Sequence, residues 1–313
     1  MRFREGLPQL AGDRLFVTDG GIETVLIFHR GFELPEFAAF DLLKDEAGTA
    51  ALRDYYEPYI TIARGAGAGF ILEAPTWRAS RDWGARLGYS PEALAGANRA
   101  AIALMEELRA EHEGDVSPIV ISGCIGPRGD GYASSDLMSA VEAEGYHAEQ
   151  IATFAGSAAD MATALTLTYA DEAVGIARAA AAARLPVAIS FTVETDGRLA
   201  SGQSLGDAIE QVDEETSSTP AYYMVNCAHP THFAAELAGD DRWLERLLGV
   251  RANASERSHA ALDEAEGLDD GDPADLGARH RELDRGLPGL RVVGGCCGTD
   301  HRHVSEICAA VGA

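Results

Sequence analysis

Residues 290–299 read Leu-Arg-Val-Val-Gly-Gly-Cys-Cys-Gly-Thr, an apolar run that ends in glycines and two adjacent cysteines. The run is typical of a buried strand, and the glycines remove side-chain bulk at the point where the strand stops. The two sulfurs can therefore be presented at a strand end instead of being packed into the core. A third cysteine, Cys227, ends another apolar run at 222–226.

Apolar runs of this kind recur along the whole chain and alternate with alanine-rich helical stretches. The pattern predicts strands over 14–18, 69–73, 118–122, 161–167, 186–192, 221–226, 249–252 and 290–294. It predicts helices between them, for example over 91–112, 147–160, 170–184 and 204–214. Alternating strands and helices indicate a parallel sheet of the α/β class, and eight such units in 313 residues indicate a (β/α)8 TIM barrel. We expect a single domain over 1–313, with the acidic stretch 255–288 as a partly helical connection inside it.

The composition limits the classes of partner. The 313 residues are 46% hydrophobic, enough for a large core, and the net charge of -25 argues against nucleic acid, which needs basic patches. No apolar run approaches the roughly 20 residues of a membrane span. The five cysteines are an odd number, and no apolar signal core follows residues 1–5. A cytoplasmic protein with reduced thiols is the expectation, and a homo-oligomer is compatible with the sequence.

Polar residues and cysteines follow the predicted strands at their carboxyl ends, where barrels of this type hold their working residues. Cys227 and the pair Cys296-Cys297 fall at two such ends. Three thiols so placed are typical of a zinc site with one open position, the mark of catalytic zinc. The alternatives are buried, small apolar side chains or a disulfide between the two adjacent cysteines.

Four motifs resemble, in order and spacing, the homocysteine S-methyltransferase family: Asp19-Gly20-Gly21, Gly126-Pro127, Asn226-Cys227 and 294–299. The resemblance covers nearly the whole chain. It implies a (β/α)8 barrel with one catalytic Zn²⁺ held by Cys227, Cys296 and Cys297. It also implies a small-molecule thiol acceptor as the fourth ligand and a methyl sulfonium donor, such as S-methylmethionine or S-adenosylmethionine. Some relatives use betaine or a corrinoid-linked methyl group instead.

The resemblance also suggests substrate contacts. Asp19, together with the turn at Gly20 and Gly21, would receive the amino group of the substrate, and Thr76 would lie near it. Glu194 is a candidate for binding a cation. Asn226 is included among these contacts and is expected to orient the zinc site through hydrogen bonds. No general base is assigned, because methyl transfer is an in-line displacement that needs two aligned sulfurs more than a proton acceptor.

Two positions depart from the family pattern. Many members carry Glu-Thr at the end of strand four, where the glutamate holds the amino group of homocysteine, but this chain reads Leu165-Thr166. The first motif continues Thr24-Val25 where Thr-Glu is common. Leucine cannot hold an ammonium group, so another carboxylate, Glu23, Glu73 or Glu194, would have to do so.

Three functions therefore remain open. The first is methyl transfer from a sulfonium donor to homocysteine, giving methionine. The second is the same chemistry on another small thiol. The third is a zinc-binding barrel without turnover that acts as a binding or regulatory protein.

Other cysteines and histidines receive weaker assignments. Cys124 and Cys308 are expected to be core residues, the second in an apolar C-terminal helix. His229 and His301 follow the ligand motifs closely, and they are candidates for contacts around the metal site rather than for ligands.

Overall fold

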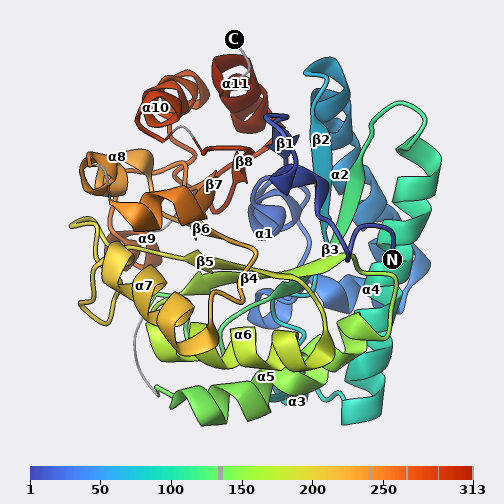
Figure 1. Ribbon diagram of the computed structural model, residues 1–313. Helices are drawn as coiled ribbons and strands as arrows, with labels where there is room; N and C mark the ends of the chain where they lie inside the picture. Colours follow the sequence, from blue (N-terminus) through green and yellow to red (C-terminus); the bar gives the residue numbers. More distant parts are fainter. Residues whose placement is uncertain (133–136, 240, 266, 288, 312–313) are drawn as a thin grey trace.

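The chain folds into one closed barrel. The computed structural model describes residues 1–132, 137–239, 241–265, 267–287 and 289–311. Within these residues, eight parallel strands close in the order β1 to β8, and Phe16 in the first strand pairs with Val292 in the last. Figure 1 shows the strands at the centre of the molecule with the helices around them. The predicted (β/α)8 TIM barrel is confirmed.

The strands lie close to their predicted positions. They are β1 Phe16–Val17, β2 Gly69–Glu73, β3 Ile119–Ile125, β4 Met161–Leu167, β5 Val187–Phe191, β6 Tyr222–Asn226, β7 Leu247–Ala252 and β8 Val292–Gly295. The third strand is longer than predicted, because Gly123 continues it. A Cβ at this glycine would lie 2.5 Å from a ring carbon of Phe154, so the missing side chain lets a helix pack closely on the strand.

Helices follow the strands along the chain. Their bounds are α1 Ile22–Thr24, α2 Glu46–Gly65, α3 Arg81–Arg86, α4 Pro91–His112, α5 Ala140–Ala155, α6 Ala170–Ala183, α7 Leu205–Thr216, α8 Pro230–Phe233, α9 His259–Asp263, α10 Pro273–Gly286 and α11 His301–Val311. Among the described residues, none of these helices combines the length and the apolar composition that crossing a membrane requires.

The start of α5 differs from the prediction. The helix was expected over 147–160 and is observed at Ala140–Ala155. Ser139 caps its first turn: the Ser139 hydroxyl accepts from the Glu142 backbone, and the Glu142 carboxylate accepts from the Ser139 backbone. This reciprocal capping fixes a helix start that the alanine pattern alone places too late.

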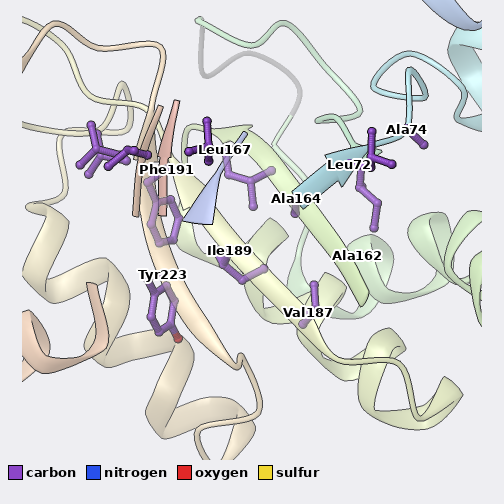
Figure 2. Packing of buried hydrophobic residues seen from close by; sticks show 14 of the residues in the cluster. Leu72, Ala74, Ala162, Ala164, Leu167, Val187, Ile189, Phe191 and Tyr223 are labelled. Atoms are coloured by element: carbon purple, nitrogen blue, oxygen red, sulfur yellow. The ribbon is translucent and has the colours of Figure 1, made fainter. Parts of the chain in front are cut away.

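The outer face of the barrel is apolar and packs against the helices. Figure 2 shows Val187, Ile189 and Phe191 along β5, with Tyr223 of β6 beside them. The rings of Phe191 and Tyr223 are stacked with their centroids 6.4 Å apart. A parallel barrel covered by helices buries this face completely, which explains the nearly continuous apolar runs in the sequence.

The interior of the barrel changes from apolar to polar along its axis. One cluster is apolar and contains Phe16, Ile71, Val120, Met161, Ala188, Tyr222, Met224 and Val292. Toward the carboxyl ends of the strands, the Thr163 hydroxyl donates to Glu73 Oε1 at 2.8 Å, joining the non-adjacent strands β4 and β2 across the interior. The polar end of the barrel therefore faces the loops that follow the strands.

Candidate active site

A cavity of about 370 Å³ lies at the carboxyl ends of the strands. Its lining comes from the ends of β1, β2, β3, β4, β7 and β8 and from the loops that follow them. The aromatic part of the lining consists of Phe28, Phe37, Tyr56, Trp77 and Tyr132. This is the position at which (β/α)8 barrels bind their substrates.

The three cysteines of the two motifs meet beside this cavity. The Sγ atoms of Cys227, Cys296 and Cys297 lie within 4.8 Å of one another. Two sulfurs on a zinc tetrahedron with 2.3 Å bonds are about 3.8 Å apart, so the cluster is close to the size that the metal requires. Cys296 and Cys297 line the cavity, and all five cysteines of the chain are free thiols. The sequence prediction that these three thiols come together therefore agrees with the geometry.

The backbone of β7 holds the two cysteine loops together. The Cys227 backbone N–H donates to Arg251 O at 3.0 Å, and the Cys296 backbone N–H donates to Ala252 O at 2.8 Å. Cys227 has a φ of 55°, a left-handed conformation that is uncommon outside glycine. Such strain at a strand end is typical of a functional site, and here it turns the sulfur toward the other two.

Neighbouring polar groups point at the sulfurs. The Tyr132 hydroxyl lies 3.1 Å from Cys227 Sγ and 3.2 Å from Cys297 Sγ. Asn226 Nδ2 lies 3.7 Å from Cys296 Sγ, and Asn253 Nδ2 lies 4.0 Å from Cys227 Sγ. These groups fix the positions of the three thiols from different sides.

Asn226 is itself held in one orientation. Its Oδ1 accepts from the Thr166 backbone at 2.8 Å and from the Ser190 hydroxyl at 2.7 Å, while its Nδ2 donates to Thr166 Oγ1 at 2.8 Å. The amide is fully buried below the cysteines. Asn226 therefore contacts the cysteine cluster with an amide group that Thr166 and Ser190 hold in one orientation.

The electrostatics of the cluster favour a bound cation. The pKa of Cys296 is lowered because its sulfur accepts hydrogen bonds from Cys227 and Cys297 and lies near the positive charge of Arg251. The pKa of Cys227 is raised, because its thiol is engaged with the two other thiols and is buried. Three thiolates within 4.8 Å of one another would repel each other, so a cation among them is needed to keep all three ionised. Soft thiolate ligands suit zinc, so these residues fit the metal.

Asp19 lines the cavity, but both of its carboxylate oxygens have partners. Arg251 Nη2 donates to Oδ1 at 2.6 Å, and the Tyr55 hydroxyl donates to Oδ2 at 2.8 Å. Asp19 and Arg251 are both buried, and burial raises the pKa of Asp19 while Arg251 opposes that rise. The charge of Asp19 is therefore balanced inside the protein, and a substrate ammonium would have to share it.

The glycines that follow Asp19 allow two loops to touch. Gly20 and Gly21 both line the cavity. A Cβ at Gly21 would lie 2.5 Å from the Cys296 carbonyl oxygen. A side chain at this position would push the loop after β1 away from the cysteine pair, so the glycine is required by close approach.

Thr76 and Glu194 lie outside the cavity lining within the described residues. The Thr76 hydroxyl donates to Cys124 O at 2.8 Å and accepts from the Cys124 backbone at 3.1 Å, and this pair ties the end of β2 to β3. Glu194 Oε1 lies 3.0 Å from His259 Nδ1. His229 caps α8 through its side chain, and it is also outside the lining.

The wall near the cysteines carries one acidic, one basic and one apolar side chain of interest. Glu23, on α1, and Arg78 line the cavity together with Leu165 of β4. Burial raises the pKa of Glu23 to about 7, against a hydrogen bond from its own backbone, and burial lowers the pKa of Arg78 to about 10. Leu165, at the position where the family resemblance leads us to expect an ammonium-binding glutamate, is thus an apolar part of the wall.

Sequence reasoning missed Arg251, Tyr132, Asn253 and His259. Arg251 stands at the carboxyl end of a predicted strand, the same kind of position as Cys227 and the cysteine pair, so the sequence held a signal for it. Tyr132 lies in the loop after β3 and His259 begins the short helix α9, and no local pattern marks either residue. His259 Nε2 is 2.7 Å from the Cys227 carbonyl oxygen, and its ring centroid is 4.3 Å from that of Tyr132. Only the folded chain brings these two side chains together.

Comparison with known proteins gives a consistent result. The family model for homocysteine S-methyltransferase matches residues 16–311. The homocysteine methyltransferase MmuM from Escherichia coli in its oxidised form is 19% identical over 96% of both chains, with a TM-score of 0.74. Its metallated form is 18% identical over the same shares, with a TM-score of 0.73. The search of curated proteins found no match. The structural likeness concerns the fold, and the family match spans nearly the whole chain: the chain belongs to the homocysteine S-methyltransferase family and is a methyltransferase.

Proposed function

We propose that this protein is a zinc-dependent enzyme that transfers a methyl group from a sulfonium donor, S-methylmethionine or S-adenosylmethionine, to homocysteine, giving methionine. The observation that carries the proposal is the cluster of three thiols, which borders a cavity at the carboxyl ends of the strands. Family membership supports the reaction class.

Cys227, Cys296 and Cys297 would hold the zinc ion. Bound zinc would supply the positive charge that keeps the acceptor sulfur deprotonated near neutral pH, where a free thiol with a pKa near 8.5 is mostly protonated. Asn226 and Asn253 keep the cysteine sulfurs in place through their amide groups. The Tyr132 hydroxyl lies next to two of the three sulfurs, and Tyr132 lines the cavity in which the acceptor would bind.

The transfer itself needs alignment more than acid–base chemistry. A lone pair of the acceptor sulfur attacks the methyl carbon while the bond between that carbon and the donor sulfur breaks. The bonding pair stays on the donor sulfur, which becomes a neutral thioether, so no protein group has to take up a proton in this step. The aromatic side chains of Phe28, Phe37 and Trp77 on the wall suit a cationic sulfonium, because ring faces attract positive charge.

Free thiols as ligands also favour a reducing compartment. Cys296 and Cys297 are partly exposed and adjacent, so an oxidising environment would tend to join them and remove two ligands. A cytoplasmic location is therefore part of the proposal.

One experiment tests the whole proposal. Freshly reduced protein is analysed for zinc, and methyl transfer from each sulfonium donor to homocysteine is followed as methionine formed. One zinc per chain together with methionine supports the proposal. One zinc without methionine would move the acceptor to another thiol, an outcome that Leu165 on the wall makes worth measuring. Protein that binds no zinc would refute the metal site.

A further inference from the structure

The cavity wall lacks a carboxylate at the end of β4, where the family resemblance predicts a glutamate and this chain has Leu165. Leu165 lines the cavity with only 7% of its surface exposed, and it presents an apolar surface. An α-amino acid acceptor carries an ammonium group, and burying that charge without a partner is costly. A different acidic side chain of the lining must therefore meet the ammonium.

Most acidic groups near the cavity are already engaged. Both oxygens of Asp19 have partners, Arg251 and Tyr55. Glu73 Oε1 accepts from the Thr163 hydroxyl, and its Oε2 is buried without a hydrogen-bond partner. Glu73 is only 5% exposed, so a substrate ammonium reaches it less easily than it reaches a half-buried carboxylate on the wall. Glu194 is not part of the lining, and its Oε1 lies 3.0 Å from Nδ1 of the lining residue His259.

Three other acidic side chains of the lining are also poorly placed to bind the substrate ammonium. Asp130 and Asp263 lie at the exposed rim. Asp269 accepts a hydrogen bond from Ser255 at 2.7 Å.

Glu23 is the remaining candidate. It follows the Gly20-Gly21 turn on α1, lines the cavity, and is half-buried. Among the described residues, no other side chain forms a hydrogen bond or an ion pair with its carboxylate. Its carboxylate interacts electrostatically with Arg78, and both residues line the same cavity as Cys296 and Cys297.

Arg78 provides a fixed positive charge on the same wall. Its guanidinium lies between two indole rings, 4.0 Å from the Trp77 centroid and 3.7 Å from the Trp83 centroid. One nitrogen donates to Gly129 O at 3.3 Å, while the buried Nε has no partner. A guanidinium held flat in this way is suited to a planar carboxylate.

We propose that Glu23 receives the ammonium group and Arg78 the carboxylate of an α-amino acid thiol, whose sulfur then lies at the cysteine cluster. This inference rests on the proposed function. It gives the chain a substrate-binding pair on the loops after β1 and β2 in place of a glutamate on β4. Glu23 and Arg78 then select the acceptor by its zwitterionic end.

The test compares three thiols with the same carbon spacing between the sulfur and the charged groups. They are homocysteine, 4-mercaptobutyrate, which lacks the amino group, and 3-mercaptopropylamine, which lacks the carboxylate. Binding to the zinc-loaded enzyme is measured by calorimetry without donor, and kcat/KM is measured with donor. The wild type should prefer homocysteine over each analogue by about tenfold to a hundredfold, the range of one charge-assisted contact. Glu23→Gln should lose the preference over 4-mercaptobutyrate, and Arg78→Gln the preference over 3-mercaptopropylamine.

Ratios within one variant separate recognition from folding, because a structural defect would weaken all three thiols together. Glu33→Gln is the matched control for the acidic residue, since it is exposed on the same connection and lies outside the lining. Arg86→Gln is the control for the basic one: Arg86 stacks on the same Trp83 ring, at 4.3 Å, but also lies outside the lining. Both controls should keep the wild-type ratios.

The outcomes separate the two proposals. If the wild type methylates homocysteine but either variant keeps the wild-type ratio for its analogue, the assignment of Glu23 and Arg78 is overturned while the proposed function stands. If the zinc-loaded wild type neither binds nor methylates any of the three thiols, both are overturned.

Discussion

Cys296 and Cys297 lie at the rim of the barrel, partly exposed and beside the cavity, so their sulfurs add little to the packed core. We expect Cys296→Ala and Cys297→Ala each to lower the zinc content from about one per chain to near zero and to abolish methyl transfer, because a site with two thiolates binds zinc much more weakly. Tm should stay within roughly 5 °C of the wild type, a change of one or two kcal/mol. Metal analysis and thermal unfolding check both statements.

Cys308→Ala is the matched control, since Cys308 is buried in α11 and belongs to the hydrophobic core. It should keep its zinc and its activity. Undiminished zinc in Cys297→Ala would contradict the ligand assignment, and an unfolded variant would mean that the metal holds the barrel together.

Arg251 carries a buried positive charge that forms an ion pair with Asp19. The two groups meet at 2.6 Å with side chains 5% and 4% exposed, in surroundings where an unpaired charge is poorly solvated. We expect Arg251→Met to destabilise the fold by about 3–5 kcal/mol, because Asp19 is then left with only Tyr55. The double variant Arg251→Met, Asp19→Asn should lose less stability than the two single variants lose together. Urea unfolding of the four proteins measures the difference, and strictly additive losses would refute the coupling.

At the scale of elements, the sequence predicts well where local pattern and fold agree. The bounds of β4 match the prediction, since the run 161–167 is buried on both faces and stops at a helix start. Prediction is poorer where tertiary contacts decide. β3 continues through Gly123 because Phe154 packs against its backbone, and α5 begins at a capping box rather than at the alanine run.

The same division holds for the candidate site. Cys227 and the cysteine pair stand next to apolar runs, so their placement at strand ends follows from the sequence. The contact between Tyr132 and the sulfurs joins a loop after β3 to the ends of β6 and β8, and no local pattern records it. The engagement of Asp19 by Arg251 likewise depends on a residue 232 positions away in the chain.

The helix α10 contains a histidine that should make stability depend on pH. His280 is fully buried, its Nδ1 lies 2.8 Å from Leu276 O, and burial lowers its pKa to about 4. An unfolded histidine has a pKa of about 6.5, so between these values the unfolded state binds the extra proton. The folded state therefore has its full stability with respect to His280 above about pH 6.5. It loses up to about 3 kcal/mol of that stability as the pH falls toward 4.

His280→Gln should remove that part of the pH dependence. The free energy of unfolding of the wild type should fall more steeply than that of the variant between pH 7 and pH 4, when both are measured with urea. His301→Gln, at the exposed start of α11, controls for the loss of a histidine as such. Parallel curves for the wild type and His280→Gln would show that the buried ring does not titrate in this way.

At the scale of the whole molecule, the chain carries 50 acidic and 25 basic residues, for a net charge of -25. The barrel is closed by backbone pairing and an apolar layer, neither of which carries a net charge. The surplus charge lies on the exterior and opposes compaction through self-repulsion.

At an ionic strength of about 0.01 M this repulsion acts over roughly 30 Å, and at about 0.1 M over roughly 10 Å. We therefore expect Tm to rise by several degrees over this range. Sodium and potassium chloride should act alike if the cause is screening, and sucrose should not reproduce the salt dependence. A Tm that stays flat or falls with either salt would mean that the exposed ion pairs, which salt weakens, outweigh the surplus of negative charge.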